Sequence, residues 1–390
     1  MGPDVIVVGA GFAGCVTARI LADAGAQVLI LERRNHIGGN AYDWLDENGV
    51  MRHEYGPHIF HTNSEKAIDF LSRFTEWYDY EHKVLGYIEG KLVPIPFNLH
   101  SIEMLFPKEK AEHLKEVLIN VYGMGNKIPI LELRKSDDPM IQELAEYIFE
   151  HVFKYYTMKQ WGYTAEEIDP AVTGRVPVSI SYDDRYFQDR FQKMPKGGFT
   201  KLFENMLEHE NIMVQLETEA MNHIHINTDT GLVQYKGARF TKPIIYTGLV
   251  DQLLDYVNGD LPYRSLEFNV RTEYGEVQPV TTVNYPTPAN EHLYTRITEY
   301  KHMMENPPKE RSTVAVELPY AYDRNAAKGN VPYYPVFTDE SKKSYQAYVD
   351  LLKDIPNVYL LGRLAEYKYY NMDAIVEAAI NFSYQFLEKK

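Results

Sequence analysis

The opening of the chain constrains its fold more than any other segment does. Residues 4–34 read as a buried strand, a glycine-rich turn, a helix and a second buried strand, and Gly9, Gly11 and Gly14 give the turn the spacing GxGxxG. Such glycines permit a tight turn and a close backbone approach to a pyrophosphate, while Glu32, at the end of the second strand, can accept a ribose hydroxyl. The segment therefore predicts a unit that binds a dinucleotide at the helix N-terminus.

The residues after Glu32 favour FAD over NAD as the dinucleotide. The sequence ERRNHIGGNAYD leads to the pair Gly38 and Gly39, and it resembles the extended fingerprint of glutathione-reductase-like FAD proteins, in particular their amine-oxidase and dissociation-inhibitor branch. The chain contains no second GxGxxG, so we expect no separate NAD(P)H domain.

The rest of the chain alternates between helical and strand-like patterns. Apolar residues between 141 and 153 follow helical spacing, with Asp138 as N-cap and Pro139 in the first turn, and Thr164 with Glu167 predicts a further short helix. Residues 263–337 alternate like antiparallel strands. The fold class expected is α/β with mixed α+β insertions: a discontinuous Rossmann-like FAD-binding domain (1–80, 196–248 and 338–390), a helical domain (98–170, with 249–262 as a candidate addition) and an antiparallel sheet domain (81–97, 171–195 and 263–337).

Composition narrows the function classes. The 390 residues carry a net charge of −15, which repels nucleic acid, so an anionic substrate needs a local arginine cluster. Cys15 is the single cysteine, which excludes an intramolecular disulfide and disfavours a cysteine-based metal site. No apolar run approaches the ~20 residues that span a bilayer, and no signal peptide is evident. We expect a cytoplasmic protein with neither membrane nor nucleic-acid partners.

The segment YGPHIFHT holds two histidines, His58 and His61. A spacing of three suits a metal on a helix, but Pro57 and its neighbours predict a loop or strand, and no third ligand is evident. We therefore expect no metal. Ordinary packing and cofactor contact remain as alternatives, and a neutral imidazole beside a flavin could hydrogen-bond its ring heteroatoms.

Several further motifs resemble one family. In order along residues 4 to about 385, GAGFAG, ERRNHIGGNAYD, YGPHIFHT, YYTMKQWG, YTRITEYKH, PYYP and GRLAEYKYYNMD are similar to motifs of the UDP-galactopyranose mutases. This resemblance implies an isomerase that interconverts UDP-galactopyranose and UDP-galactofuranose with reduced FAD, through a covalent flavin–sugar adduct and without net redox change. It also implies a supply of galactofuranose for cell-surface glycans, a homodimer, and an electron donor such as NAD(P)H or a reductase.

The resemblance also assigns expected roles to single residues. Arg175, on a mobile loop, and Arg296 are the catalytic candidates, because the fixed fork of an arginine suits a diphosphate. The residues expected at the substrate are Phe153, Tyr156, Thr157, Trp161, Tyr186, Asn284, Tyr334, Arg363 and Tyr369. The residues expected at the cofactor are Gly9, Gly11, Phe12, Gly14, Glu32, Arg33, Gly39, Asn40, His58, Ile59, His61, Gly362, Arg363, Tyr370, Asn371 and Met372. A packing role remains open for Phe153, Tyr186 and Asn284.

The stretch GRLAEYKYYNMD precedes the last helix. Gly362 is expected to let the backbone approach the flavin, and the N–H groups of the helix that starts at Asn371 are expected to face the flavin pyrimidine. Asn371 stands where some relatives have Asp, so no carboxylate role is expected there. Two other functions share the N-terminal fingerprint: a flavin amine oxidase or related dehydrogenase, which would consume oxygen, and a flavin-free binding protein, which would be colourless.

Overall fold

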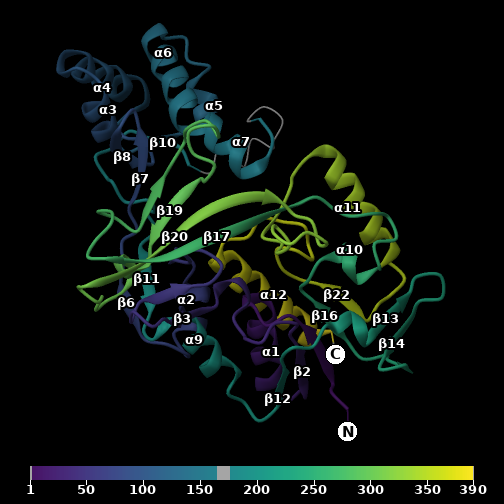
Figure 1. The fold of residues 1–390 in the computed structure, drawn as a ribbon. Helices are drawn as coiled ribbons and strands as arrows, with labels where there is room; N and C mark the ends of the chain where they lie inside the picture. Colours follow the sequence, from purple (N-terminus) through teal and green to yellow (C-terminus); the bar gives the residue numbers. More distant parts are fainter. Residues whose placement is uncertain (1, 165–175, 390) are drawn as a thin grey trace.

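The computed structural model describes residues 2–164 and 176–389 (Figure 1). Its N-terminal strand lies in a five-stranded sheet whose strands come from three distant parts of the chain. In sheet order these strands are β12 (Ile212–Gln215), β2 (Val28–Leu31), β1 (Val5–Val8), β16 (Ile244–Tyr246) and β22 (Val358–Leu360). All four pairings are parallel, so the carboxyl ends of the strands meet at one edge.

Both faces of this parallel sheet are buried, because alternate residues of β1 enter two different cores. Val5 and Val7 pack into a core with α1 (Phe12–Asp23), α9 (Gly198–Leu207) and α12 (Met372–Glu388). Ile6 and Val8 pack into a second core with α10 (Val250–Leu253), α11 (Asp339–Leu351), β13 (Ile224–Asn227) and β14 (Leu232–Tyr235). The last two strands form an antiparallel sheet with β15 (Ala238–Arg239). Apolar strands of this kind are typical of doubly covered parallel sheets.

A second large sheet crosses the middle of the molecule (Figure 1). In sheet order its strands are β21 (Tyr334–Pro335), β17 (Tyr263–Tyr274), β20 (Arg311–Ala321), β19 (Arg296–Glu299), β18 (Thr282–Asn284), β7 (Val84–Ile88) and β8 (Lys91–Ile95). The expected purely antiparallel sheet is wrong at one pairing, since β18 pairs with β7 in parallel. These two strands belong to segments far apart in the chain, so no hairpin fixes their relative direction.

A small three-stranded sheet connects residues that the sequence analysis assigned to different domains. β11 (Phe191–Pro195) pairs with β5 (Phe60–Thr62) on one side and with β6 (Trp77–Asp79) on the other. Residues 191–195 were expected in the sheet domain, but by hydrogen bonding they belong with the N-terminal part of the chain.

Helices at one end of the molecule enclose a third core (Figure 1). They are α3 (Leu99–Leu105), α4 (Lys108–Tyr122), α5 (Ile130–Leu133) and α6 (Pro139–Ile148), and α7 (Tyr155–Trp161) follows them in the chain without contributing to this core. The predicted N-cap is confirmed, since Asp138 accepts hydrogen bonds from the N–H groups of Met140 and Ile141. The expected uninterrupted helix is wrong over Phe149–Lys154, which is a π-helical segment, a form frequent at functional sites.

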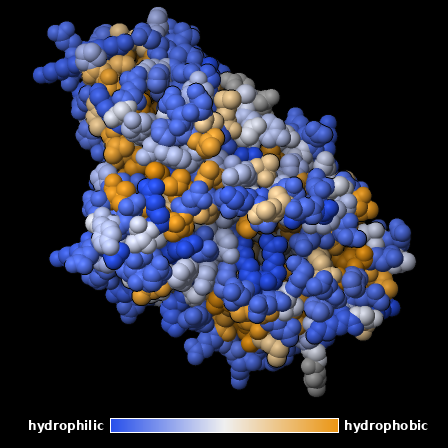
Figure 2. Space-filling view, in the orientation of Figure 1, coloured by the Kyte–Doolittle hydropathy of each residue, from blue (hydrophilic) through white to orange (hydrophobic). Residues whose placement is uncertain are grey.

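The remaining elements are short. They are β3 (Asp43–Leu45), β4 (Met51–His53), α2 (Glu65–Leu71), β9 (Lys127–Ile128) and β10 (Val178–Ser179). The short helix expected after Thr164 lies outside the described residues. Over the ranges that are described, no helix is both long and apolar enough to cross a bilayer. On the face shown in Figure 2, hydrophobic residues form several separate patches among hydrophilic ones.

Candidate functional site: two joined cavities

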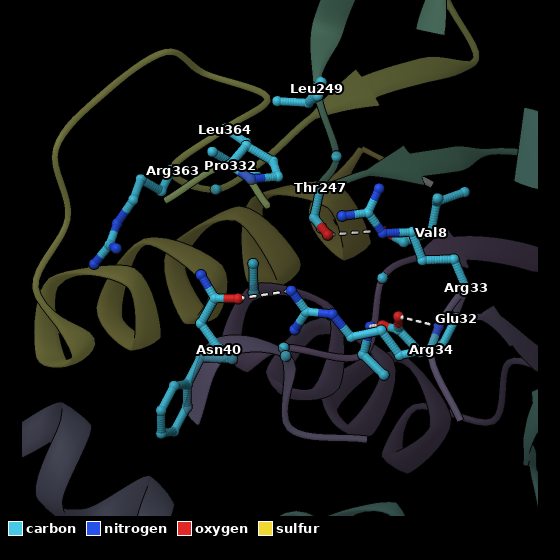
Figure 3. A pocket seen from close by; sticks show the side chains of 18 of the residues that line it. Val8, Glu32, Arg33, Arg34, Asn40, Thr247, Leu249, Pro332, Arg363 and Leu364 are labelled. Atoms are coloured by element: carbon cyan, nitrogen blue, oxygen red, sulfur yellow. Dashed lines mark hydrogen bonds between the residues drawn. The ribbon is translucent and has the colours of Figure 1, made fainter. Parts of the chain in front are cut away.

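The first cavity lies at the carboxyl edge of the parallel sheet and has a volume of about 230 Å³. Glu32, Thr247 and Gly362 line it from the ends of three different strands, β2, β16 and β22. Figure 3 shows Glu32, Arg33 and Arg34 on one side of this pocket and Pro332, Arg363 and Leu364 on the other. This edge is where open parallel sheets bind nucleotides.

The glycines of the first turn form a cradle that side chains would fill. A Cβ at Gly14 would lie 2.0 Å from the carbonyl oxygen of Gly9, and a Cβ at Gly39, where φ is +57°, would lie 2.9 Å from Cα of Gly11. Gly14 does not line the cavity itself; it lets α1 pack against the turn. Gly9, Gly11 and Gly39 do line it. The backbone is therefore open to a closely approaching ligand.

Two helices direct their N-termini at this cavity. Phe12 at the start of α1 and Met372 at the start of α12 both line it, and neither N-cap residue, Gly11 or Asn371, makes a side-chain capping hydrogen bond. The first N–H groups of both helices are thus not capped by their N-cap side chains. Helix N-termini of this kind bind phosphate and other anionic groups.

Glu32 and Arg34 lie side by side in the cavity wall that follows β2. Glu32 accepts hydrogen bonds from the N–H groups of Ala10 (2.8 Å) and Arg34 (2.9 Å), and it is buried. The Arg34 guanidinium donates to Asn40 Oδ1 (2.9 Å) and lies 4.1 Å from the ring centroid of Tyr55. Arg34 was not predicted from the sequence, although it directly follows Glu32 and Arg33. The glycine cradle, the uncapped helix starts and Glu32 together fit a flavin dinucleotide.

A second cavity, of about 470 Å³, adjoins the first. Its lining comes from one face of the seven-stranded sheet, from α7 and from the segment before α12. Residues that line both cavities are Asn40, His58, Tyr333, Arg363 and Met372. The joined cavities can therefore hold a flavin with its ring end beside a second ligand.

His58 presents an acceptor nitrogen at this junction. Its Nδ1 lies 2.8 Å from the carbonyl oxygen of Gly56, an acceptor only, so Nδ1 carries the proton and Nε2 has the lone pair. Burial, with a smaller contribution from nearby His53, lowers the pKa of His58 to about 3. The imidazole therefore stays neutral at physiological pH. His61 instead pairs with Asp189 (Nδ1–Oδ2 2.8 Å) and stacks on Phe187.

Arg363 packs against two aromatic rings where the two cavities join. Its guanidinium carbon lies 5.0 Å from the ring centroid of Tyr334 and 5.4 Å from that of Tyr369, and the guanidinium donates to the carbonyl oxygen of Tyr370 at 2.6 Å. These contacts fix the position of the Arg363 guanidinium, so its remaining N–H groups are available to a ligand in the second cavity. Tyr367, by contrast, donates to the carbonyl of Pro262 and belongs to the second core.

Arg296 lines the second cavity from β19 and is paired with a buried carboxylate. Its Nε donates to Glu317 Oε2 at 2.7 Å, and Thr295 Oγ1 donates to the other oxygen of Glu317 at 3.3 Å. Glu317 is only 2 % exposed. Close to this carboxylate the pKa of Arg296 rises, despite burial, which opposes the charged form. The Nε bond fixes the plane of the guanidinium, and the sequence did not reveal Glu317 as its partner.

The structure places all nine residues expected at the substrate, and the catalytic candidate Arg296, around the second cavity. Those that line it are Phe153, Tyr156, Thr157, Trp161, Tyr186, Asn284, Arg296, Tyr334, Arg363 and Tyr369. Arg175 lies outside the described residues. Of the residues expected at the cofactor, Ile59, His61 and Asn371 line the second cavity rather than the first, and Gly14 lines neither. Lining residues that the sequence analysis missed include Tyr55, His82, Gln160, Thr282, Glu317 and Tyr333.

The fold and the two cavities define a flavoprotein with a ligand pocket against the dinucleotide site. The UDP-galactopyranose mutase family model matches residues 151–369, and a model described as an NAD(P)-binding Rossmann-like domain matches residues 7–74. A UDP-galactopyranose mutase from Mycoplasma pneumoniae is 35 % identical over 99 % of this chain and 96 % of its own. The chain belongs to the UDP-galactopyranose mutase family, which confirms the isomerase class and the FAD cofactor that the resemblance implied.

Two further relatives bear on the fold and on the choice of nucleotide sugar. A crystal structure of a reduced UDP-galactopyranose mutase superposes with a TM-score of 0.70 over 100 % of this chain and 96 % of that chain, at 15 % identity, and supports the fold. A dTDP-fucopyranose mutase from Escherichia coli is 32 % identical over 96 % of both chains. Sequence identity alone therefore does not show whether a UDP-sugar or a dTDP-sugar is the substrate.

Proposed function

We propose that this chain interconverts UDP-galactopyranose and UDP-galactofuranose. One observation carries the proposal: a dinucleotide cavity with a phosphate-binding glycine turn opens, at His58 and Arg363, into a cavity that contains oriented arginines and aromatic rings. A nucleotide sugar needs such a set, because its diphosphate requires fixed cations and its base requires a stacking surface.

Reduced FAD, when bound, supplies a nucleophile for the anomeric carbon of the sugar. The protein residues bind and orient the reactants. Arg296, fixed by Glu317, and Arg363, packed against two tyrosine rings, offer their remaining N–H donors to the diphosphate. The diphosphate is also the leaving group, so these cations stabilise the charge that develops when the anomeric bond breaks.

Aromatic side chains of α7 are suited to the nucleoside. Trp161 is nearly buried and lies 6.0 Å, between ring centroids, from Tyr334. Tyr156 lines the same cavity, and burial raises the pKa of its hydroxyl, so that it remains a neutral donor. We assign Tyr156 and Trp161 to the uracil base, which can stack on their rings.

The same proposal covers the finer assignments. The FAD domain is of the glutathione-reductase-like type, with the sheet β13–β14–β15 covering one face of the parallel sheet as support. The enzyme acts as a cytoplasmic homodimer and receives electrons from NAD(P)H or from a reductase. Arg175 completes the diphosphate clamp.

The test is conversion of UDP-galactofuranose by the FAD-loaded protein under anaerobic, reducing conditions, with products separated by chromatography. We expect UDP-galactopyranose as product and no reaction with oxidised protein. dTDP-fucofuranose, supplied in parallel, distinguishes the substrate class. Preferred turnover of dTDP-fucofuranose would overturn the substrate assignment, and absence of turnover with both compounds would overturn the mutase assignment.

A further inference from the structure

His82 is a buried histidine that lines the substrate cavity and has no role in the function proposed above. It precedes β7, is only 4 % exposed, and lies beside the rings of Phe187 (centroids 5.9 Å apart) and Tyr186 (5.7 Å), which contact each other. Its Nδ1 lies 3.1 Å from the hydroxyl of Tyr80. Its Nε2 makes no hydrogen bond with any residue in the described ranges.

Counting hydroxyl protons determines which nitrogen of His82 carries hydrogen. The Tyr80 hydroxyl contacts both His82 Nδ1 and Thr281 Oγ1, and Thr281 Oγ1 has no second hydrogen-bond partner among the residues described. If Tyr80 donated to Thr281, the Thr281 proton would remain without an acceptor in a buried position. If Thr281 donates to Tyr80 and Tyr80 donates to His82 Nδ1, both hydroxyl protons have an acceptor. The second arrangement leaves Nε2 protonated and directed away from Tyr80.

The surroundings keep His82 neutral and Tyr80 protonated. Burial, with smaller contributions by charge repulsion from Arg296 and then His61, lowers the pKa of His82 to about 3. Burial also raises the pKa of the Tyr80 hydroxyl. The relay from Thr281 through Tyr80 to His82 therefore ends in a neutral N–H donor at physiological pH.

Two further polar atoms on the same sheet face lack partners. Thr282 Oγ1 and Asn284 Oδ1 are buried without a hydrogen-bond partner among the described residues, and both side chains line the second cavity. Thr282 pairs with Val84, which lies two residues after His82, and Asn284 lies two residues after Thr282. Side chains two residues apart point to the same face, so those of His82, Thr282 and Asn284 lie on one face of the sheet. Buried polar atoms are normally satisfied, so unpartnered ones in a cavity wall indicate a polar ligand.

We propose that His82, fixed by the Tyr80–Thr281 relay, donates a hydrogen bond from Nε2 to a hydroxyl of the substrate's sugar. The inference rests on the proposed function, because it takes the second cavity to hold a nucleotide sugar. A neutral donor among neutral Thr282 and Asn284 suits an uncharged hydroxyl, whereas the diphosphate has Arg296 and Arg363. His82 is thus a substrate-binding residue, and Tyr80 is a positioning residue that acts through it.

The test compares His82→Gln, His82→Asn and His82→Phe in FAD-loaded protein. A glutamine amide reaches the position of Nε2, whereas an asparagine amide reaches only that of Nδ1. We expect His82→Phe and His82→Asn to lower kcat/KM for UDP-galactofuranose by about tenfold, the size of one lost neutral hydrogen bond, and to weaken UDP-galactose binding to oxidised protein similarly. His82→Gln should stay within about threefold of wild type.

Deoxygenated substrates identify the bonded group. UDP-galactose analogues lacking the 2-, 3-, 4- or 6-hydroxyl should show the His82→Phe penalty in binding for all but one, because the analogue that lacks the bonded hydroxyl has nothing to lose. Tyr80→Phe should weaken binding in the same pattern, while Tyr78→Phe should not; Tyr78 donates to the carbonyl of Met303, outside the cavity. An equal His82→Phe penalty for every analogue would overturn the proposal, as would wild-type affinity in His82→Phe. Inactivity of the wild type would overturn the proposed function instead.

Discussion

Removal of Arg296 is expected to have two separable consequences. Glu317 is 2 % exposed and its Oε2 lies 2.7 Å from Arg296 Nε, so Arg296→Ala leaves a buried carboxylate without its cation. Two unit charges about 4 Å apart attract by ~4 kcal/mol at an effective dielectric constant of ~20. Breaking a buried pair by removing one partner commonly costs about 3–5 kcal/mol, and we expect a loss of stability in this range.

The second consequence is a loss of turnover, since the diphosphate loses a directed guanidinium. A charged hydrogen-bond donor contributes up to ~3 kcal/mol, so kcat/KM for UDP-galactofuranose should fall by about 100-fold. The double variant Arg296→Ala/Glu317→Gln separates the two effects. Its neutral amide removes the stranded charge, so stability should largely return while turnover remains low.

Urea unfolding of the FAD-loaded proteins measures the first effect, and initial rates under anaerobic reduction measure the second. Flavin absorbance per protein should be unchanged in all variants, because Arg296 lines only the second cavity. Equal stability of the single and double variants would refute the stranded-carboxylate reasoning. Recovery of turnover in the double variant would refute the diphosphate role of Arg296.

Two other predictions follow from the structure, and a third, for Arg175, follows from the family resemblance. Gly14→Ala should abolish FAD binding, because its Cβ would lie 2.0 Å from the Gly9 carbonyl oxygen; retained flavin absorbance would contradict the cradle. Burial lowers the pKa of three histidines, His53, His58 and His82, from 6.5 to about 3. Between these pH values the unfolded chain binds more protons than the folded protein does. The free energy of unfolding must therefore fall as the pH drops from about 6.5 toward 3, by ~1.4 kcal/mol per pH unit for each histidine. Urea titrations of His53→Gln should show this slope reduced by one histidine, and an unchanged slope would exclude His53 as a contributor. Arg175→Lys should remain well below wild-type turnover, because an ammonium cannot make the bidentate phosphate contact; full activity would argue against a bidentate role.

The sequence predicted the parts of the site that are local in the chain. Gly9, Gly11 and Glu32 lie within one strand–helix–strand unit, and the physical reason for their spacing is contained in that unit. The start of the last helix, α12, a few residues after Gly362, was also predicted from local sequence. The catalytic arginine candidate Arg296 came from resemblance, as did the aromatic residues of α7.

What the sequence could not predict depends on contacts between distant segments. Glu317 lies beside Arg296 only because β19 and β20 pair, and β7 reaches β18 through a parallel pairing across almost two hundred residues. The relay from Thr281 to His82 joins the ends of those same two segments. Single-sequence patterns give strand propensity but no register, so neither pairing could be derived.

The central claim is isomerisation without net redox change, and the most direct measurement of it is product formed per electron pair supplied. FAD-loaded protein is reduced once with a limiting, known amount of dithionite under anaerobic conditions, and UDP-galactofuranose is then added in excess. Because isomerisation consumes no electrons, we predict ~100 or more product molecules per electron pair. A ratio fixed at one would contradict the account, since a dehydrogenase consumes one donor for each product.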